Sequence, residues 1–234
     1  MAYEVKLIFH CLALTTYLVA IIWQLNFMNA SLTHSVEVMA MINFKERYFT
    51  GWNFIVHVIY FSLALSEDIQ EIATQKTRTK KTRSSITYLK AYIFTMFIVP
   101  FSVFVTSMFW GLYHYNRELV YPTAMDEVFP SWFNHIIHTC IFIFMVLEFN
   151  FIGHHPEFSF RSIFLGMTVT FIVYYTVFFY HYSTVGYFLY PVFHLFSWSE
   201  IIGFLAAIYF FSLFMSRFGI TVQNFIKTAK CKTK

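Results

Sequence analysis

Long apolar runs separated by short polar segments divide the chain into six parts. Each run is close to the about 20 residues that an α-helix needs to cross ~30 Å of hydrocarbon. We therefore predict six membrane spans with these approximate bounds: Leu7–Met28, Phe49–Ser66, Ala91–Tyr113, Trp132–Ile152, Ser162–Tyr182 and Ile201–Ile220. Pro100 lies inside the third run and predicts a kink rather than an end, because neighbouring helices can satisfy the backbone groups that proline frees.

The composition favours the same class of fold. Of the 234 residues, 58% are apolar and 23% aromatic, whereas only 12% are charged. A soluble domain normally has roughly a quarter of its residues charged. We predict an all-α, polytopic membrane helix bundle in which residues 1–234 form one integral membrane domain. The first run is too long for the apolar part of a cleaved signal peptide, and the three cysteines predict no disulfide framework.

The basic residues predict the orientation of the spans. All but three of the 16 lysines and arginines flank the spans on one side, and the exceptions are Lys45, Arg47 and Arg117. Cytoplasmic loops carry the excess of basic residues in membrane proteins. Both termini are therefore expected in the cytoplasm, and the segments before Phe49 and Trp132 on the lumenal or outer side. The basic run 76–83 is interpreted as a cytoplasmic loop near anionic lipid, so the net charge of +4 predicts no nucleic-acid partner.

Two short motifs bear on the compartment. Asn29-Ala30-Ser31 is a glycosylation sequon on the predicted lumenal side. Lys230 and Lys232 stand fifth and third from the end of the chain, the spacing of a cytosolic dilysine signal for retrieval to the endoplasmic reticulum. The alternative is a basic tail against anionic lipid, which would equally suit a protein of the plasma membrane.

Polar residues inside the predicted spans indicate where chemistry could take place. Ionisable groups are costly in hydrocarbon and usually face a cavity, a partner or a reaction. Thr50, Asn53 and His57 follow one stripe of the second span at helical spacing. The fourth span carries Asn134 and His138 four residues apart, with His135 between them. Since both spans begin on the predicted lumenal side, Thr50 and His138 should lie at about the same depth.

These residues fit acyl-transfer chemistry if they meet. A threonine hydroxyl needs an adjacent base to act as a nucleophile, and histidine suits that role because its pKa is near neutral. An oxyanion donor is also required, and the candidates are Asn53, Asn134 and His135. The simpler interpretation is an interhelical hydrogen bond, which we favour for four further histidines: His57, His114, His181 and His194.

Two other classes of protein remain open from the residues alone. A haem or metal membrane oxidoreductase would use histidine pairs, but the predicted topology places His135 and His138 on one side and His154-His155 on the other. A non-enzymatic lipid-binding or regulatory membrane protein fits six spans equally well. The sequence contains no glycine-rich phosphate loop and no zinc-type Cys–His spacing, so we predict neither a cofactor nor a metal. The number of subunits is left open.

Four segments together resemble a known family. They are Tyr48-Phe49-Thr50, the run 113–122 (YHYNRELVYP), the run 130–139 (PSWFNHIIHT) and Tyr190-Pro191. They are similar to the family of the androgen-induced protein and the androgen-dependent TFPI-regulating protein, over nearly the whole chain. The resemblance implies a multi-pass membrane hydrolase that cleaves fatty acid esters of hydroxy fatty acids. By match, the threonine nucleophile falls on Thr50 and the histidine on His138, and the expected partners are a lipid ester substrate and the surrounding membrane lipid.

Overall fold

The computed structural model describes residues 2–28, 36–77, 85–152 and 158–232, which are helical throughout apart from short connections and contain no strand. Six helices in this part of the chain are long and apolar enough to cross a membrane. They are Tyr3–Phe27, Phe49–Thr74, Ser85–Leu119, Ser131–Glu148, Phe160–Val185 and Trp198–Ile226. The predicted all-helical bundle with six spans is thereby confirmed.

The individual elements follow these spans closely. The first half of the chain contains α1 (Ala2–Phe27), α2 (Val36–Asn43), the short 3-10 helix η2 (Lys45–Arg47), α3 (Phe49–Thr77), α4 (Ser85–Ile93), the π-helical segment η3 (Phe94–Ile98) and α5 (Val99–Asn116). The second half contains η4 (Arg117–Leu119), η5 (Thr123–Glu127), α6 (Ser131–His135), the π-helical segment η6 (Ile136–Cys140), α7 (Ile141–Glu148), α8 (Phe160–Val185), η7 (Pro191–Leu195) and α9 (Trp198–Lys232).

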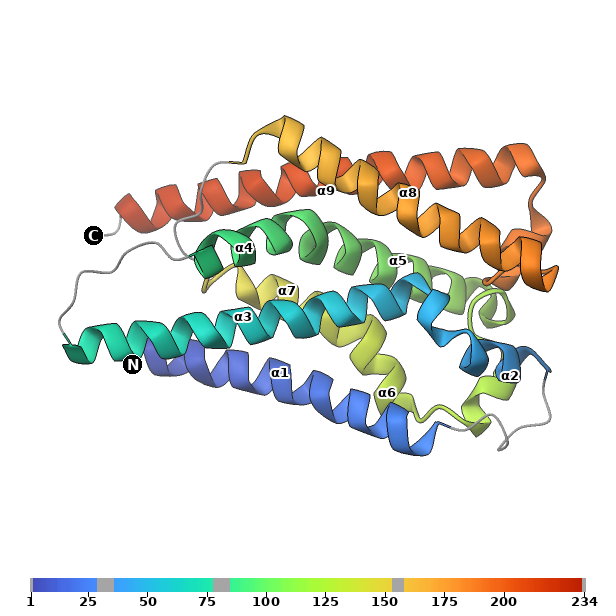
Figure 1. Cartoon of the computed structure of the whole chain (residues 1–234), viewed down its shortest axis with the longest axis horizontal. Coiled ribbons are helices and arrows are strands. Elements are labelled where there is room, and N and C mark those ends of the chain that lie inside the picture. The colour runs from blue at the N-terminus through green and yellow to red at the C-terminus, as the bar shows by residue number, and fades with distance from the viewer. Residues whose placement is uncertain (1, 29–35, 78–84, 153–157, 233–234) are drawn as a thin grey trace.

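The helices lie roughly along one axis and form a bundle (Figure 1). α1 packs beside α3, whereas α8 and α9 pack together and α9 contacts α5. Both chain termini lie at one end of the bundle, which we call the terminal end. The opposite end, which we call the distal end, carries η2, the start of α3 and the connection between α8 and α9. An even number of spans requires that the chain begin and end on the same side of the membrane.

Four predictions concern residues outside the described part of the chain. The Asn29 sequon, residues 78–83 of the basic run and the pair His154-His155 are not described, and the side chains of Lys230 and Lys232 are not described either.

The third span continues through Pro100, as the sequence predicts. Proline has no N–H and its ring collides with the carbonyl four residues earlier. The preceding turn adopts π-helical geometry, in which the Val99 N–H donates to the Phe94 carbonyl. The wider turn before Pro100 lets the helix run from Ser85 to Leu119 without a break.

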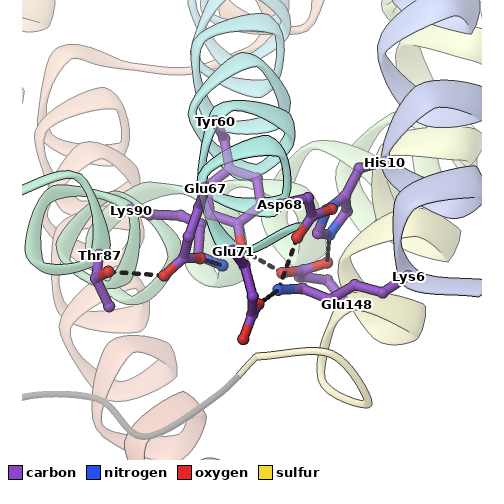
Figure 2. Close-up of polar contacts among 9 residues, drawn as sticks. All are labelled: Lys6, His10, Tyr60, Glu67, Asp68, Glu71, Thr87, Lys90 and Glu148. Carbon is purple, nitrogen blue, oxygen red and sulfur yellow. Dashed lines mark hydrogen bonds and ion pairs between the residues drawn. The ribbon is translucent and has the colours of Figure 1, made fainter. Parts of the chain in front are cut away.

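The second span is longer than its apolar pattern predicts. The sequence suggests an end near Ser66, but α3 continues to Thr77. The reason is that its acidic residues are paired rather than solvated. Glu67 and Asp68 are both buried, in a cluster of charged and polar side chains from four helices that Figure 2 shows at the terminal end of the bundle.

His10 of α1 lies at the centre of this cluster. Its Nδ1 is 2.6 Å from an oxygen of Asp68 and its Nε2 is 2.8 Å from an oxygen of Glu148. The second oxygen of Glu148 accepts a hydrogen bond of 2.6 Å from the Tyr60 hydroxyl. His10 and Glu148 are completely buried. One hydrogen-bonded array therefore joins α1, α3 and α7, although His10 and Glu148 are 138 positions apart.

Two further ion pairs extend the array. The Lys6 ammonium lies 2.7 Å from Asp68, and the Lys90 ammonium lies 2.5 Å from Glu67. Glu67 also accepts a hydrogen bond of 2.7 Å from Thr87, so α4 is joined to α3. Buried charges are tolerated when they are paired in this way. The array thus fixes the positions of four helices at the terminal end.

Breaking this array should destabilise the protein. We expect Glu148→Ala to lower the free energy of unfolding by about 3–5 kcal/mol, because the variant leaves His10 and Tyr60 buried with a missing partner. The double variant His10→Leu/Glu148→Leu should lose less than the sum of its single changes, since the two residues interact. Thermal unfolding in detergent measures both effects, with Glu127→Gln as an exposed control. Additive losses would show that the two side chains are not coupled.

The orientation of the bundle is a separate prediction. The excess of basic residues on one side predicts that the terminal end faces the cytoplasm. In intact microsomes, a tag at the C-terminus should therefore be digested by added protease. Protection of the tag from the protease would show the opposite orientation, with the distal end in the cytoplasm.

Candidate active site

A mainly apolar cavity lies at the distal end, between α3, α5, α6, η6, α8 and α9. Its volume is about 190 Å³, more than ten times the roughly 10–15 Å³ that a cavity needs to hold one water molecule. Aromatic and aliphatic side chains form most of the wall. The polar residues on it include Thr50, Asn134 and His138. Three of the predicted site residues, from two different spans, therefore line the same cavity.

Thr50 is held in place at the beginning of α3. The Trp52 indole N–H donates to the Glu46 carbonyl at 2.8 Å, which ties the first turn of the helix to η2. The Phe49 N–H donates to the Tyr190 hydroxyl at 2.9 Å. The first N–H groups of a helix have no acceptor within the helix itself. Tyr190 supplies one such acceptor and joins the start of α3 to the connection between α8 and α9.

The path of that connection depends on Gly186. This residue ends α8 with φ of 87°, in the left-handed conformation that side chains disfavour. The chain then turns towards η7, and Tyr190 immediately precedes η7. Burial raises the pKa of Tyr190 and of Tyr48, whose rings are 5.2 Å apart. Both phenols are therefore neutral hydrogen-bonding groups on the cavity wall.

The Thr50 hydroxyl is free within the described part of the chain. Most other threonines in the spans donate to the carbonyl four residues earlier, as Thr16, Thr168 and Thr176 do at 2.8–2.9 Å. For Thr50 that carbonyl belongs to Glu46, and it accepts a hydrogen bond from the Trp52 indole N–H instead. A hydroxyl on a cavity wall without a described hydrogen bond is available to a ligand.

His138 is oriented by its neighbour on the preceding turn. Its Nδ1 lies 2.7 Å from the side-chain oxygen of Asn134 and 3.1 Å from the Asn134 carbonyl. Because both partners are acceptors, Nδ1 carries the proton and Nε2 retains its lone pair. The ring stacks on Phe109 with centroids 3.5 Å apart and planes 9° apart. His138 is thus fixed in the tautomer that a general base requires.

The backbone around His138 departs from the α-helix. Residues Ile136–Cys140 form a π-helical turn, a geometry that is frequent at functional sites. The Thr106 hydroxyl of α5 donates to the His138 carbonyl at 2.7 Å and ties this turn to the third span. Nothing in the sequence distinguishes Phe109 or Thr106 as site residues, because a contact between spans leaves no periodic pattern along the chain.

Thr50 and His138 line one cavity without a hydrogen bond between them in this structure. Hydrogen bonds between catalytic groups are often long before substrate binds and shorten in the complex.

The other two predicted oxyanion donors do not line this cavity. Asn53 is buried, at 1% exposure, and its side-chain amide has no described hydrogen-bond partner. His135 is exposed, stacks on Trp110 with centroids 5.2 Å apart and lies 3.1 Å from the Thr139 hydroxyl. Of the three candidates, Asn134 alone is on the cavity wall.

The other histidines of the spans have structural contacts. His57 bridges two helices, because its Nε2 lies 3.1 Å from the Ser102 hydroxyl of α5 while its Nδ1 bonds to the Asn53 carbonyl. This confirms its interpretation as an interhelical hydrogen-bonding residue. His181 lies 3.1 Å from the Arg47 guanidinium. The described residues contain no group of three or more His, Cys, Asp and Glu that could hold a metal ion.

The fold and the cavity together define a multi-pass membrane protein with an apolar cavity between its helices. The family model described as FAR-17a/AIG1-like protein matches residues 5–224, and the chain belongs to this family.

Curated relatives come from mammals. The chain is 32% identical to the androgen-dependent TFPI-regulating protein of Rattus norvegicus over 181 residues, which cover 77% of this chain and 76% of the relative. It is 30% identical to the protein of the same name from Homo sapiens over 71% of this chain and 70% of that one. It is 26% identical to the human androgen-induced gene 1 protein over 54% of each. No solved structure matches this chain.

Proposed function

We propose that this chain is a membrane-embedded carboxylic ester hydrolase that cleaves fatty acid esters of hydroxy fatty acids. The observation that carries the proposal is the pairing of two groups on one apolar cavity. One is the unbonded Thr50 hydroxyl, and the other is His138 with Nδ1 held by Asn134. The family resemblance implies the same two residues and the same class of substrate. A cavity with mainly apolar walls suits acyl chains.

The proposed reaction is acyl transfer through a covalent intermediate. Thr50 Oγ attacks the ester carbonyl carbon while Nε2 of His138 takes the hydroxyl proton. The tetrahedral intermediate collapses, the bond to the alcohol oxygen breaks, and His138 gives its proton to the departing hydroxy fatty acid. Water then attacks the acyl-Thr50 ester and His138 accepts its proton. Collapse of the second intermediate releases the fatty acid and returns the proton to Thr50.

Two donors are placed to stabilise the oxyanion. The backbone N–H of Thr50 lies in the first turn of α3, where helical N–H groups lack acceptors and the helix dipole favours negative charge. The Asn134 side chain directs its oxygen to His138, so its NH₂ group is the part left to donate. We favour these two groups over Asn53 and His135, since neither of those lines the cavity.

The proposal can be tested by incubating the purified protein, in nanodiscs, with an ester of palmitate and hydroxystearate. We expect release of palmitate and hydroxystearate at a rate proportional to protein. The same apolar cavity would also suit a non-enzymatic lipid-binding protein. Saturable binding of the ester without product release would favour that second function.

A further inference from the structure

One lysine is among the residues that line the cavity. Lys45 of η2 lines it, and among the described lining residues no other arginine or lysine and no carboxylate occurs. The remainder of the wall is apolar or carries neutral polar groups. A single ammonium group beside an apolar space can orient an amphiphilic molecule, because it attracts the polar end and not the apolar end.

The charge of Lys45 is not neutralised within the described part of the chain. Its Nζ has one weak hydrogen bond, 3.5 Å to the Ile42 carbonyl, and no described carboxylate lies within 4.0 Å. Arg47, two residues later, differs in this respect. Its guanidinium is 3.9 Å from Glu46, 3.1 Å from His181 and 4.4 Å from the Phe44 ring centroid. Of the two basic residues in η2, only Lys45 lines the cavity, and it has no described carboxylate partner.

Lys45 is also held close to Thr50. The Tyr48 N–H donates to the Lys45 carbonyl at 3.4 Å. That carbonyl lies 3.1 Å from the position a Cβ would have on Gly51, the residue after Thr50. The backbone of Lys45 therefore packs directly against the first turn of α3. Lys45 and Thr50 are therefore neighbouring residues on the cavity wall.

We propose that Lys45 binds the free carboxylate of the substrate and selects esters that carry one over neutral esters. This inference rests on the proposed hydrolase function and deepens it. The ammonium holds the carboxylate at the rim, the acyl chains enter the apolar cavity, and the ester carbonyl lies between Thr50 and His138. Ion pairing with a carboxylate stabilises the bound state more than a neutral contact does. Lys45 is a specificity-determining residue, since it takes no part in proton transfer.

The test uses two substrates that differ in one group. They are the palmitate ester of hydroxystearic acid and the same ester with its carboxyl group methylated. For Lys45→Met we expect KM for the free acid to rise about 10- to 100-fold, the range of a lost charged hydrogen bond. Its kcat should change little, and both constants should be unchanged for the methyl ester. Lys45→Arg should restore most of the preference for the free acid, because it keeps the charge.

A second cation controls for the overall charge of the distal end. Arg117 follows α5 and pairs with Asp126 at 2.9 Å, and it does not line the cavity. Arg117→Met removes the same charge and should leave the preference between the two substrates intact. An equal loss for both substrates in Lys45→Met, no loss for either, or the same loss in Arg117→Met would overturn the proposal.

Binding provides a test that does not require turnover. In a Thr50→Ala background, a fluorescent fatty acid should bind more tightly than its methyl ester, and Lys45→Met should weaken only the acid. If the wild-type protein hydrolyses neither ester, the proposed hydrolase function fails, and this binding comparison still decides the role of Lys45. Equal affinity for acid and methyl ester would show that Lys45 is only an interfacial lysine.

Discussion

Replacing Thr50 with alanine is expected to abolish ester hydrolysis without reducing the amount of folded protein. Loss of a covalent hydroxyl nucleophile can lower kcat by up to about 10⁶-fold. The cost in stability should be small, because intramembrane hydrogen bonds contribute about 0.6 kcal/mol on average and the Thr50 hydroxyl has no described hydrogen bond. Product release measured in nanodiscs, with thermal unfolding in parallel, separates the two effects.

Two further variants control this result. Thr50→Ser keeps the hydroxyl and should retain part of the activity, since only the methyl group that restricts its rotamer is lost. Thr176→Ala removes a hydroxyl of α8 that is bonded to the Ile172 carbonyl at 2.8 Å, and it should hydrolyse the ester normally. If Thr50→Ala hydrolysed the ester at the wild-type rate, Thr50 would not be the nucleophile, and lipid binding would remain as the proposed function of the cavity.

The second large effect is expected at His138. His138→Gln keeps a side chain of similar size that can still reach Asn134, but an amide cannot accept the proton of Thr50. General-base catalysis contributes typically about 10²–10⁴-fold, so kcat should fall at least about 100-fold.

His135 provides the matched control for His138. The two rings lie three residues apart, but His135 is exposed and stacks on Trp110, away from the cavity. His135→Ala should therefore keep part or all of the activity. Equal and complete loss in both variants, at normal expression, would indicate that the two histidines act together, as in a metal site.

The apolar pattern predicted the six spans because each must cover its length in hydrocarbon with apolar side chains. It placed the beginning of α3 at Phe49, where the helix does begin, since the charged segment of η2 precedes it. It misplaced several ends: the third span begins at Ser85 rather than Ala91, and α9 continues past Ile220 to Lys232. Near Ser66 the pattern lost its apolar character although the helix continues, and near Ile152 apolar residues follow a helix that ends at Glu148.

Contacts between spans explain what the sequence could not reveal. Glu67 and Asp68 are compatible with a buried helix only because Lys90, Lys6 and His10 pair with them. Local periodicity contains no information on such partners. The hydrogen bond between His10 and Glu148 joins residues 138 positions apart, and no pattern in the sequence predicts it.

The same limit applies to the cavity. The stripe of Thr50, Asn53 and His57 was predicted as one polar face, but its members have different environments. Thr50 lines the cavity, whereas Asn53 and His57 are buried below it. Phe109 and Tyr190 shape the site, yet in a chain with 23% aromatic residues nothing marks them individually. The predicted roles of Thr50 and His138 remain predictions that need chemical tests.

The most direct of these tests is to locate a covalent adduct. The wild-type protein in nanodiscs is treated with a fluorophosphonate probe that reacts with activated hydroxyl nucleophiles, then digested and analysed by mass spectrometry. The account predicts one adduct, on Thr50, which is lost in Thr50→Ala and strongly reduced in His138→Gln. An adduct on any other residue, or equal labelling of the Thr50→Ala variant, would contradict the central claim that Thr50 is the nucleophile.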